Sequence, residues 1–282
     1  MPSARCRAAM CGASMQRSLI DRVYSGTISA ITGFGMLLLA PTLVVLIISF
    51  TGGITLKFPP PSWSLRWYVE LLQSQEIVEP ALTSLKVAAA ATILSAVLGG
   101  AAALGLARSR LKIARVLDAL FMSPMVLPAM AFGLSLLLVF NLLGIRLSAA
   151  TLVLGHTIIC VPFVIRMVGA SVQQLNPVLI TCSLSLGASR WYTFRRVTLP
   201  LIRRGIVASC FVAFLTSFDN VPVSLFLADA RTEVLPIKLW AILEGSLDVR
   251  VAAVSGVIVL LTLAGLVCAE IFGGVSRQIG SR

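Results

Sequence analysis

The stretch "LGASRWYTFRRVTLPLI" (residues 186–202) lies between two long apolar runs and differs in character from both. It contains a glycine, aromatic side chains beside arginines, and a Leu-Pro pair. Basic and aromatic groups together can act on lipid, on nucleic acid or on another protein. The local structure and the surrounding sequence have to decide between these classes.

Local signals predict a helical hairpin over residues 176–200. Asn176 can accept hydrogen bonds from the free N–H groups of a helix start, and Pro177 suits the first helical position. Gly187 suits the left-handed backbone that ends a helix. Ser189 can then cap a second short helix.

The hairpin is expected to end at Leu199-Pro200, which should break the chain before the next apolar run. Two uses fit such a hairpin. It can lie on the membrane surface, held by anionic lipid. Alternatively, the arginine-aromatic helix that begins at Arg190 can enter a groove on another protein. Local physical chemistry leaves these two uses about even.

The composition indicates an integral membrane protein. Of the 282 residues, 58% are hydrophobic and only 12% are charged, and the mean hydropathy is +0.97. Soluble domains have about a quarter of their residues charged, and a helix needs roughly 20 apolar residues to cross the hydrocarbon. The sequence predicts an all-α, polytopic bundle of six transmembrane helices, at 28–50, 83–107, 119–143, 148–170, 205–229 and 251–273.

The first apolar run is too long for the core of a cleavable signal peptide and lacks a clear cleavage site after it. We therefore expect an uncleaved first span. Residues 1–27 are predicted to be a cytoplasmic tail, residues 28–273 a single six-span transmembrane domain, and residues 274–282 a second cytoplasmic tail.

The distribution of Lys and Arg predicts that both termini are cytoplasmic. With the N-terminus inside, the inner segments carry about twice as many of the 23 basic residues as the outer ones, as the positive-inside tendency requires. The inner residues are Arg5, Arg7, Arg17, Arg22, Arg108, Arg110, Lys112, Arg115, Arg190, Arg195, Arg196, Arg203, Arg204, Arg277 and Arg282. The outer ones are Lys57, Arg66, Lys86, Arg146, Arg231, Lys238 and Arg250. This placement explains the net charge of +12 without nucleic acid, because no independently folded basic patch accompanies it.

A few polar residues within the predicted spans are candidates for a solute path. Asp219 and Asn220 are expected near the middle of the fifth span, where a carboxylate is costly unless it is paired or hydrated. Pro222 is expected to kink that helix. Asp219 would favour a cationic solute in transit; the alternative is a structural contact with His156 or Arg166. His156 itself is more typical of a hydrogen-bonding residue inside the bundle than of a proton relay.

Two outer segments are long enough to have structure of their own. Residues 51–82 contain Trp63, Trp67 and Tyr68, aromatic residues that favour a membrane interface. They predict an interfacial anchor, with a contact surface for an external partner as the alternative. Residues 230–250 resemble a short re-entrant or surface helix.

Catalytic and metal sites are not indicated. Six cysteines without paired spacing and a single histidine suggest neither a disulfide framework nor a metal centre. A membrane-embedded enzyme would need clustered nucleophiles, bases or ligands. The absence of GxxxxGK[ST] means that the chain cannot cradle ATP phosphates with a P-loop. We expect no cofactor bound by this chain.

The hairpin resembles the cytoplasmic signature of ABC importer permeases. That signature reads Glu-Ala-Ala, three residues, Gly, nine residues, Ile-x-Leu-Pro. Here Gly187 is followed, nine residues on, by Val197-Thr198-Leu199-Pro200. The resemblance extends from the first span to the sixth. The stretches "LPAMAFGLSLLLVF" (127–140), "GHTIICVPFVIR" (155–166) and "AFLTSFDNVPVSLFLA" (213–228) are similar to inner-membrane subunits of the spermidine/putrescine type.

The resemblance implies a type I importer fold in which the hairpin docks into a cleft of an ATPase subunit. Carried over by position, the coupling residues are Thr181, Cys182, Ser183, Gly187, Ala188, Ser189, Arg190, Leu199 and Pro200. Val197 replaces Ile conservatively. The first three stand where the signature has Glu-Ala-Ala, so the acid of one ionic contact to the ATPase is missing.

The implied protein is not an enzyme but a permease subunit in a bacterial inner membrane, forming half of a translocation path. Its implied partners are a pair of ATPase subunits that use the ATP, a second permease chain, an extracytoplasmic solute-binding protein and membrane lipid. The implied solute is a polyamine such as spermidine or putrescine. Ferric iron or phosphonate transport is an alternative, as is a self-sufficient secondary transporter, although one mid-span acid and no convincing repeat support the latter poorly.

The predicted path residues are Asp219, Asn220, Pro222 and His156.

Overall fold

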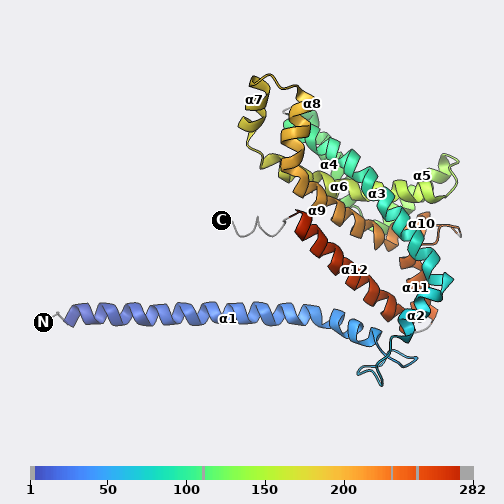
Figure 1. Cartoon of the computed structure of the whole chain (residues 1–282), viewed down its shortest axis with the longest axis horizontal. Helices are drawn as coiled ribbons and strands as arrows, with labels where there is room; N and C mark the ends of the chain where they lie inside the picture. Colours follow the sequence, from blue (N-terminus) through green and yellow to red (C-terminus); the bar gives the residue numbers. More distant parts are fainter. Residues whose placement is uncertain (1–3, 110–111, 230, 246–247, 274–282) are drawn as a thin grey trace.

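A computed structural model describes residues 4–109, 112–229, 231–245 and 248–273. The described chain is almost wholly helical, with two isolated β-bridges, Thr51 to Trp63 and Thr55 to Asp248. The prediction of an all-α membrane bundle is confirmed. Figure 1 shows long helices joined by short segments.

Five described helices are long and apolar enough to cross a membrane. They are α1 (Ala4–Ser49), of which Gly26–Ser49 forms the apolar part, α3 (Gln75–Arg108), α6 (Ala149–Gln173), α9 (Leu199–Phe218) and α12 (Val249–Gly273). They correspond to five of the six predicted spans. Helix α1 begins within the segment predicted as a tail, and most of its length lies apart from the other helices (Figure 1).

The third predicted span is not a single straight helix. Helices α4 (Lys112–Val126) and α5 (Ala129–Leu142) meet at 107° and together make at most one bent span. The bend lies at Leu127-Pro128. Proline disfavours helical backbone in the residue before it and has no N–H to continue a ladder, so α4 ends there. The prediction of a continuous helix over 119–143 is therefore wrong.

The fifth predicted span also differs, at both ends. Helix α8 (Arg190–Thr193) runs through a π-helical turn, Phe194–Thr198, into α9, so Arg190–Phe218 forms one continuous rod. The predicted break at Leu199-Pro200 is wrong. The Leu199 N–H donates to the carbonyl of Phe194, and this wider turn relieves the clash that a proline makes in a straight α-helix.

At its other end, α9 stops at Phe218, and a new short helix, α10 (Val221–Leu227), follows. The predicted helix over 205–229 is therefore two helices. Three other short helices complete the described part of the chain: α2 (Arg66–Gln73), α7 (Pro177–Ser185) and α11 (Leu235–Gly245). Helix α11 lies within the segment 230–250, where a short helix was predicted.

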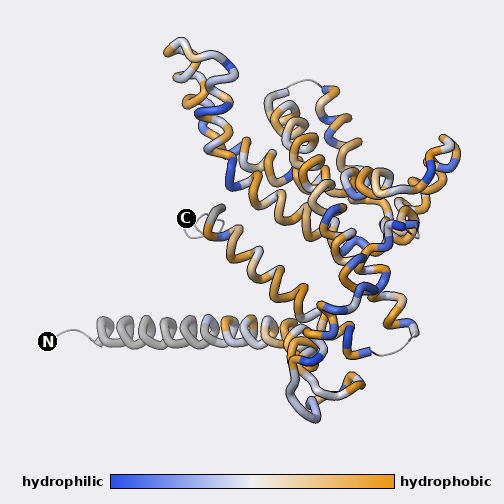
Figure 2. Tube along the Cα trace, turned by 45° about the vertical axis from the view of Figure 1, so that its right-hand side comes forward, coloured by the Kyte–Doolittle hydropathy of each residue, from blue (hydrophilic) through white to orange (hydrophobic). Residues whose placement is uncertain are grey.

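Helix α3 packs against α6 and α9 at the centre of the bundle. Small residues such as Ala88, Ala91 and Ala103 are buried along α3, and they let neighbouring backbones approach closely. Hydrophobic residues make up most of the described spans (Figure 2), and many of their large side chains are exposed on the outside of the helices. Such a surface suits hydrocarbon rather than water.

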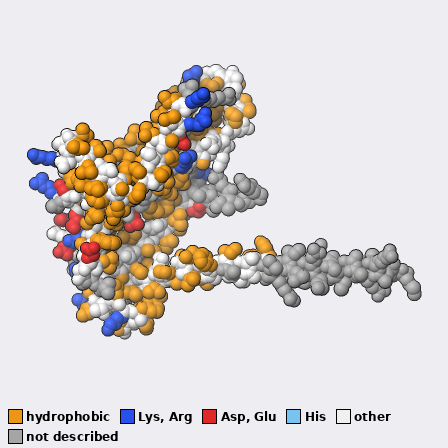
Figure 3. Space-filling model, turned by 180° about the vertical axis from the view of Figure 1, so that it is seen from behind, with side chains coloured by type: hydrophobic (Ala, Val, Ile, Leu, Met, Phe, Trp, Pro, Cys, Tyr) orange, Lys and Arg blue, Asp and Glu red, His pale blue; other side chains and the backbone are white. Residues whose placement is uncertain are grey.

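Helices α7 and α8 lie at one end of α3, which we call the hairpin end. The segment 50–65, α2 and α11 lie at its other end, which we call the loop end (Figure 1). Lys and Arg side chains lie at both ends, whereas Asp and Glu side chains lie mainly towards the loop end (Figure 3).

The contact between α3 and α6 gives a test of this packing. A methyl group added at Gly99 would lie 2.9 Å from Cβ of Val164 and 3.1 Å from the carbonyl oxygen of Val161. We expect Gly99→Ala to lower the free energy of unfolding by about 1–3 kcal/mol through overpacking. The matched variant is Gly100→Ala, because its methyl group would meet nothing within 4 Å. Thermal unfolding in detergent measures both, and equal loss in the two variants would contradict the packing.

Candidate functional site

As far as Ser189, the hairpin has the local structure that its sequence predicts. Asn176 Oδ1 accepts a hydrogen bond from the N–H of Val178 at 3.0 Å, and Pro177 begins α7. Gly187 has a φ of +85°, which L side chains rarely adopt. Ser189 Oγ accepts from the N–H of Tyr192 at 3.2 Å and so caps α8.

A side-chain contact also ties the two arms of the hairpin together. Ser183 Oγ of α7 and Oγ1 of Thr193, at the end of α8, lie 2.9 Å apart in a hydrogen bond. Thr181, at the signature's acidic position, donates its hydroxyl to the carbonyl oxygen of Pro177 at 3.2 Å. This side chain therefore bonds within its own helix.

Inside the bundle, His156 joins three helices. Its Nδ1 lies 2.8 Å from Ser217 Oγ of α9, and its Nε2 lies 3.0 Å from Ser224 Oγ of α10. The side chain is buried. A neutral imidazole has one donor and one acceptor nitrogen, so the two hydroxyls satisfy it fully. His156 thus forms hydrogen bonds within the bundle.

Asp219 lies at the break between α9 and α10 and not within a helix. It is the exposed residue that ends α9. Asn220 Oδ1 accepts from the N–H of Val223 at 2.9 Å and caps α10, and Pro222 lies in the first turn of that helix. The expected kink at Pro222 is therefore wrong, because α9 has already ended before it and Pro222 lies in the first turn of a new helix.

The expected structural contacts of Asp219 are also wrong. Arg166 lies 3.5 Å from the carboxylate of Asp118 on α4 and donates from Nε to the sulfur of Met122 at 3.1 Å. The hydrogen-bond partners of His156 are serines. The exposed carboxylate of Asp219 is therefore bonded to neither Arg166 nor His156.

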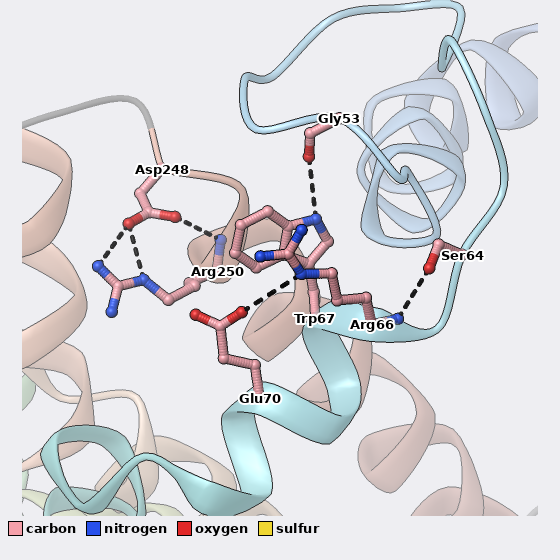
Figure 4. Close-up of polar contacts among 7 residues, drawn as sticks. All are labelled: Gly53, Ser64, Arg66, Trp67, Glu70, Asp248 and Arg250. Carbon is pink, nitrogen blue, oxygen red and sulfur yellow. Dashed lines mark hydrogen bonds and ion pairs between the residues drawn. The ribbon is translucent and has the colours of Figure 1, made fainter.

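A charged crevice of about 620 Å³ lies at the loop end (Figure 4). Nε of Arg66 lies 3.9 Å from Oε2 of Glu70, and Nη2 of Arg250 lies 2.7 Å from Oδ2 of Asp248. Burial alone would raise the pKa of Asp248, but hydrogen bonds from Arg250 and its charge outweigh that effect and lower it. Trp67 forms part of the crevice wall.

The aromatic residues of this segment divide between core and surface. Trp67 is buried and donates from Nε1 to the carbonyl oxygen of Gly53 at 3.0 Å. Tyr68 shares a hydrogen bond of 2.7 Å with Ser49. Trp67 therefore packs inside the protein and does not face a membrane interface. Trp63 is exposed.

Comparison with known proteins assigns the chain to a family. Residues 95–276 match the family described as the binding-protein-dependent transport system inner membrane component. The chain belongs to this family. It is a permease subunit of an ABC importer and a multi-pass protein of the inner membrane.

Individual relatives agree with this assignment. The permease is 27% identical over 210 residues to the spermidine/putrescine transport system permease protein PotC of Haemophilus influenzae, covering 74% of this chain and 81% of that protein. It is 32% identical over 215 residues to the molybdenum transport system permease protein ModB of Mycobacterium bovis, covering 71% and 80%.

The structure of the permease agrees as well. A bacterial alginate ABC transporter, solved in complex with an alginate-bound periplasmic protein, matches with a TM-score of 0.66 and 15% identity. The match covers 95% of this chain and 98% of that one. It shows that the permease has the fold of ABC importer permeases.

The sequence contains a signal for the start of α10 that the prediction of a single fifth helix overlooked. Asn220 precedes Pro222 by two residues, and Asn176 directly precedes Pro177. Both asparagines cap a helix that has proline in its first turn. This pattern marks helix starts. Ser217 and Ser224, the partners of His156, carry no such signal.

The histidine contact can be tested through its serines. We expect Ser217→Ala and Ser224→Ala each to lower the free energy of unfolding by about 1–3 kcal/mol, because one buried ring nitrogen loses its partner. Ser135→Ala is the control, since that side chain is exposed and bonds only within its own helix. Thermal unfolding in detergent is the measurement. Loss no larger than in the control would contradict the contact.

Proposed function

We propose that this permease forms half of the translocation path of an ATP-driven importer and is driven at the hairpin by a separate ATPase pair. The proposal rests on the continuous helix Arg190–Phe218. One end of this helix lies in the hairpin. The other end is followed by Asp219, one of the residues predicted to line the solute path. A displacement of the hairpin is therefore transmitted to the break between α9 and α10.

The rod connects to the rest of the bundle through His156. When α9 moves, the hydrogen bond between Ser217 and His156 couples α9 to α6, and the bond between Ser224 and His156 couples α10 to the same residue. In this proposal ATP acts only in the partner subunits, and the permease binds no cofactor. Its own work is to change the packing of α9 and α10 around the path.

The orientation in this proposal follows the charges. The hairpin end faces the cytoplasm with both termini, as the positive-inside tendency favours. The loop end then faces outward. Its crevice, bounded by the charged pairs Arg66 with Glu70 and Asp248 with Arg250, is the contact surface that we propose for the extracytoplasmic solute-binding protein. A mixed charged and aromatic surface is typical of such transient contacts.

A second permease chain, identical or related, completes the path. The exposed apolar helix faces are available for this partner and for lipid. The solute that we propose is a polyamine such as spermidine or putrescine. This choice is supported by the likeness to PotC and by the exposed carboxylate of Asp219, which suits a cation. The likeness to ModB favours a second candidate, a permease for another small solute, and uptake assays with both solute classes distinguish the two.

The coupling proposal has a direct test. In a background with Cys182→Ser, we expect Ala188→Cys or Ser189→Cys to crosslink to the ATPase subunit of the same importer, with a yield that changes when ATP is added. Leu72→Cys, which is exposed at the loop end, is the control and should not crosslink. Absence of a crosslink from both hairpin positions, with folded permease and ATPase present, would refute the proposal and favour a self-sufficient transporter.

The role of Asp219 has its own test. We expect Asp219→Asn to lower uptake of a cationic polyamine about tenfold, because it removes a charge worth on the order of 1.4 kcal/mol to the passing cation. Asp219→Glu should retain most uptake. The measurement is the initial rate of uptake of labelled putrescine into proteoliposomes that contain the complete importer. An unchanged rate and an unchanged solute preference would exclude this role.

A further inference from the structure

The apex of the hairpin exposes large apolar side chains. Leu186 is 88% exposed, Trp191 68% and Tyr192 56%. The Trp191 ring is supported from behind by Phe194, with their centroids 5.7 Å apart. Large apolar groups gathered on an exposed tip mark an interaction surface rather than a solvated one.

Leu186 and Tyr192 border a hollow of about 470 Å³, which is lined by Ser183, Leu186, Gly187, Ala188, Ser189 and Tyr192. The hollow is preorganised. The capped ends of α7 and α8 fix its backbone, and the bond between Ser183 and Thr193 fixes the spacing of its arms. A preorganised surface loses little conformational entropy on binding.

The chain offers no acid for an ionic contact at this surface. Residues 176–204 contain no Asp or Glu. The hydroxyl of Thr181, at the signature's acidic position, is bonded to Pro177. The charge of the segment is instead wholly positive, from Arg190, Arg195, Arg196, Arg203 and Arg204. A protein partner must therefore present an apolar cleft with an acidic rim.

We propose that Trp191 and Tyr192 anchor the hairpin in such a cleft of the ATPase subunit, and that apolar packing replaces the missing ionic contact. This inference rests on the proposed function. Aromatic side chains at the centre of an interface contribute most of its affinity. The arginines attract the acidic rim over a longer range and act mainly on the rate of association.

The shape of the hairpin favours a protein partner over lipid. Helices α7 and α8 extend the hairpin end beyond the packed spans (Figures 1 and 2). The apex residues therefore lie away from the apolar belt that the spans would place in hydrocarbon. A hairpin that lies on lipid would instead turn its aromatic side chains toward that belt.

The experiment measures the affinity of the reconstituted full-length permease pair in lipid nanodiscs for the ATPase subunit. We expect Trp191→Ala and Tyr192→Ala each to weaken binding at least tenfold, and Trp191→Phe to retain most of it. The matched control is Trp63→Ala, because Trp63 is 69% exposed but lies at the loop end. Raising the salt concentration should slow association of the unsubstituted pair and leave its dissociation rate nearly unchanged.

Two results would overturn the proposal. One refutes only the aromatic anchor, and the other also refutes the proposed coupling to the ATPase. If Ser189→Cys crosslinks to the ATPase but both alanine variants bind normally, the aromatic anchor is refuted and the coupling function stands. If no crosslink forms, and the hairpin is instead shielded from labelling by anionic vesicles, both are refuted. Unfolding midpoints equal to that of the unsubstituted permease establish that the exposed substitutions leave the fold intact.

Discussion

Backbone N–H and C=O groups within hydrocarbon have no water to bond, so each must find a partner inside the protein. The permease meets this requirement with a polar side chain at the start of three helices. Asn220 caps α10, Ser148 caps α6, and Ser84 of α3 accepts from the N–H of Leu235 at 2.8 Å where α11 begins. These three side chains accept hydrogen bonds from backbone N–H groups that the first turn of a helix leaves without a partner, so the chain can start a new helix within the bundle.

Features that depend on a few neighbouring residues could be predicted from the sequence. The caps at Asn176 and Ser189 and the left-handed Gly187 act within one turn of the chain, so no tertiary information is needed. Proline was harder to interpret. Pro128 ends a helix, whereas Pro200 lies inside a continuous rod, and only the π turn before Pro200 explains the difference. Average hydropathy does not distinguish the helix end at Pro128 from the continuous helix at Pro200.

The candidate path could be predicted only in part, because its contacts join distant segments. His156 meets serines that lie 61 and 68 residues away, and Arg166 meets an aspartate on α4. The sequence indicated that His156 and Asp219 are unusual for a membrane bundle. It could not show which partner each one has, because that depends on how α6, α9 and α10 pack.

The π turn at Phe194–Thr198 sets the rotational phase between the hairpin and the span that follows it. A π turn holds about one residue more than an α turn, and each residue of an α-helix advances the direction of its side chains by about 100°. Removing one residue here would restore a regular helix and swing the hairpin about a quarter turn around the axis of α9. The direction in which this permease presents its hairpin therefore depends on one additional residue, far from both the apex and the path.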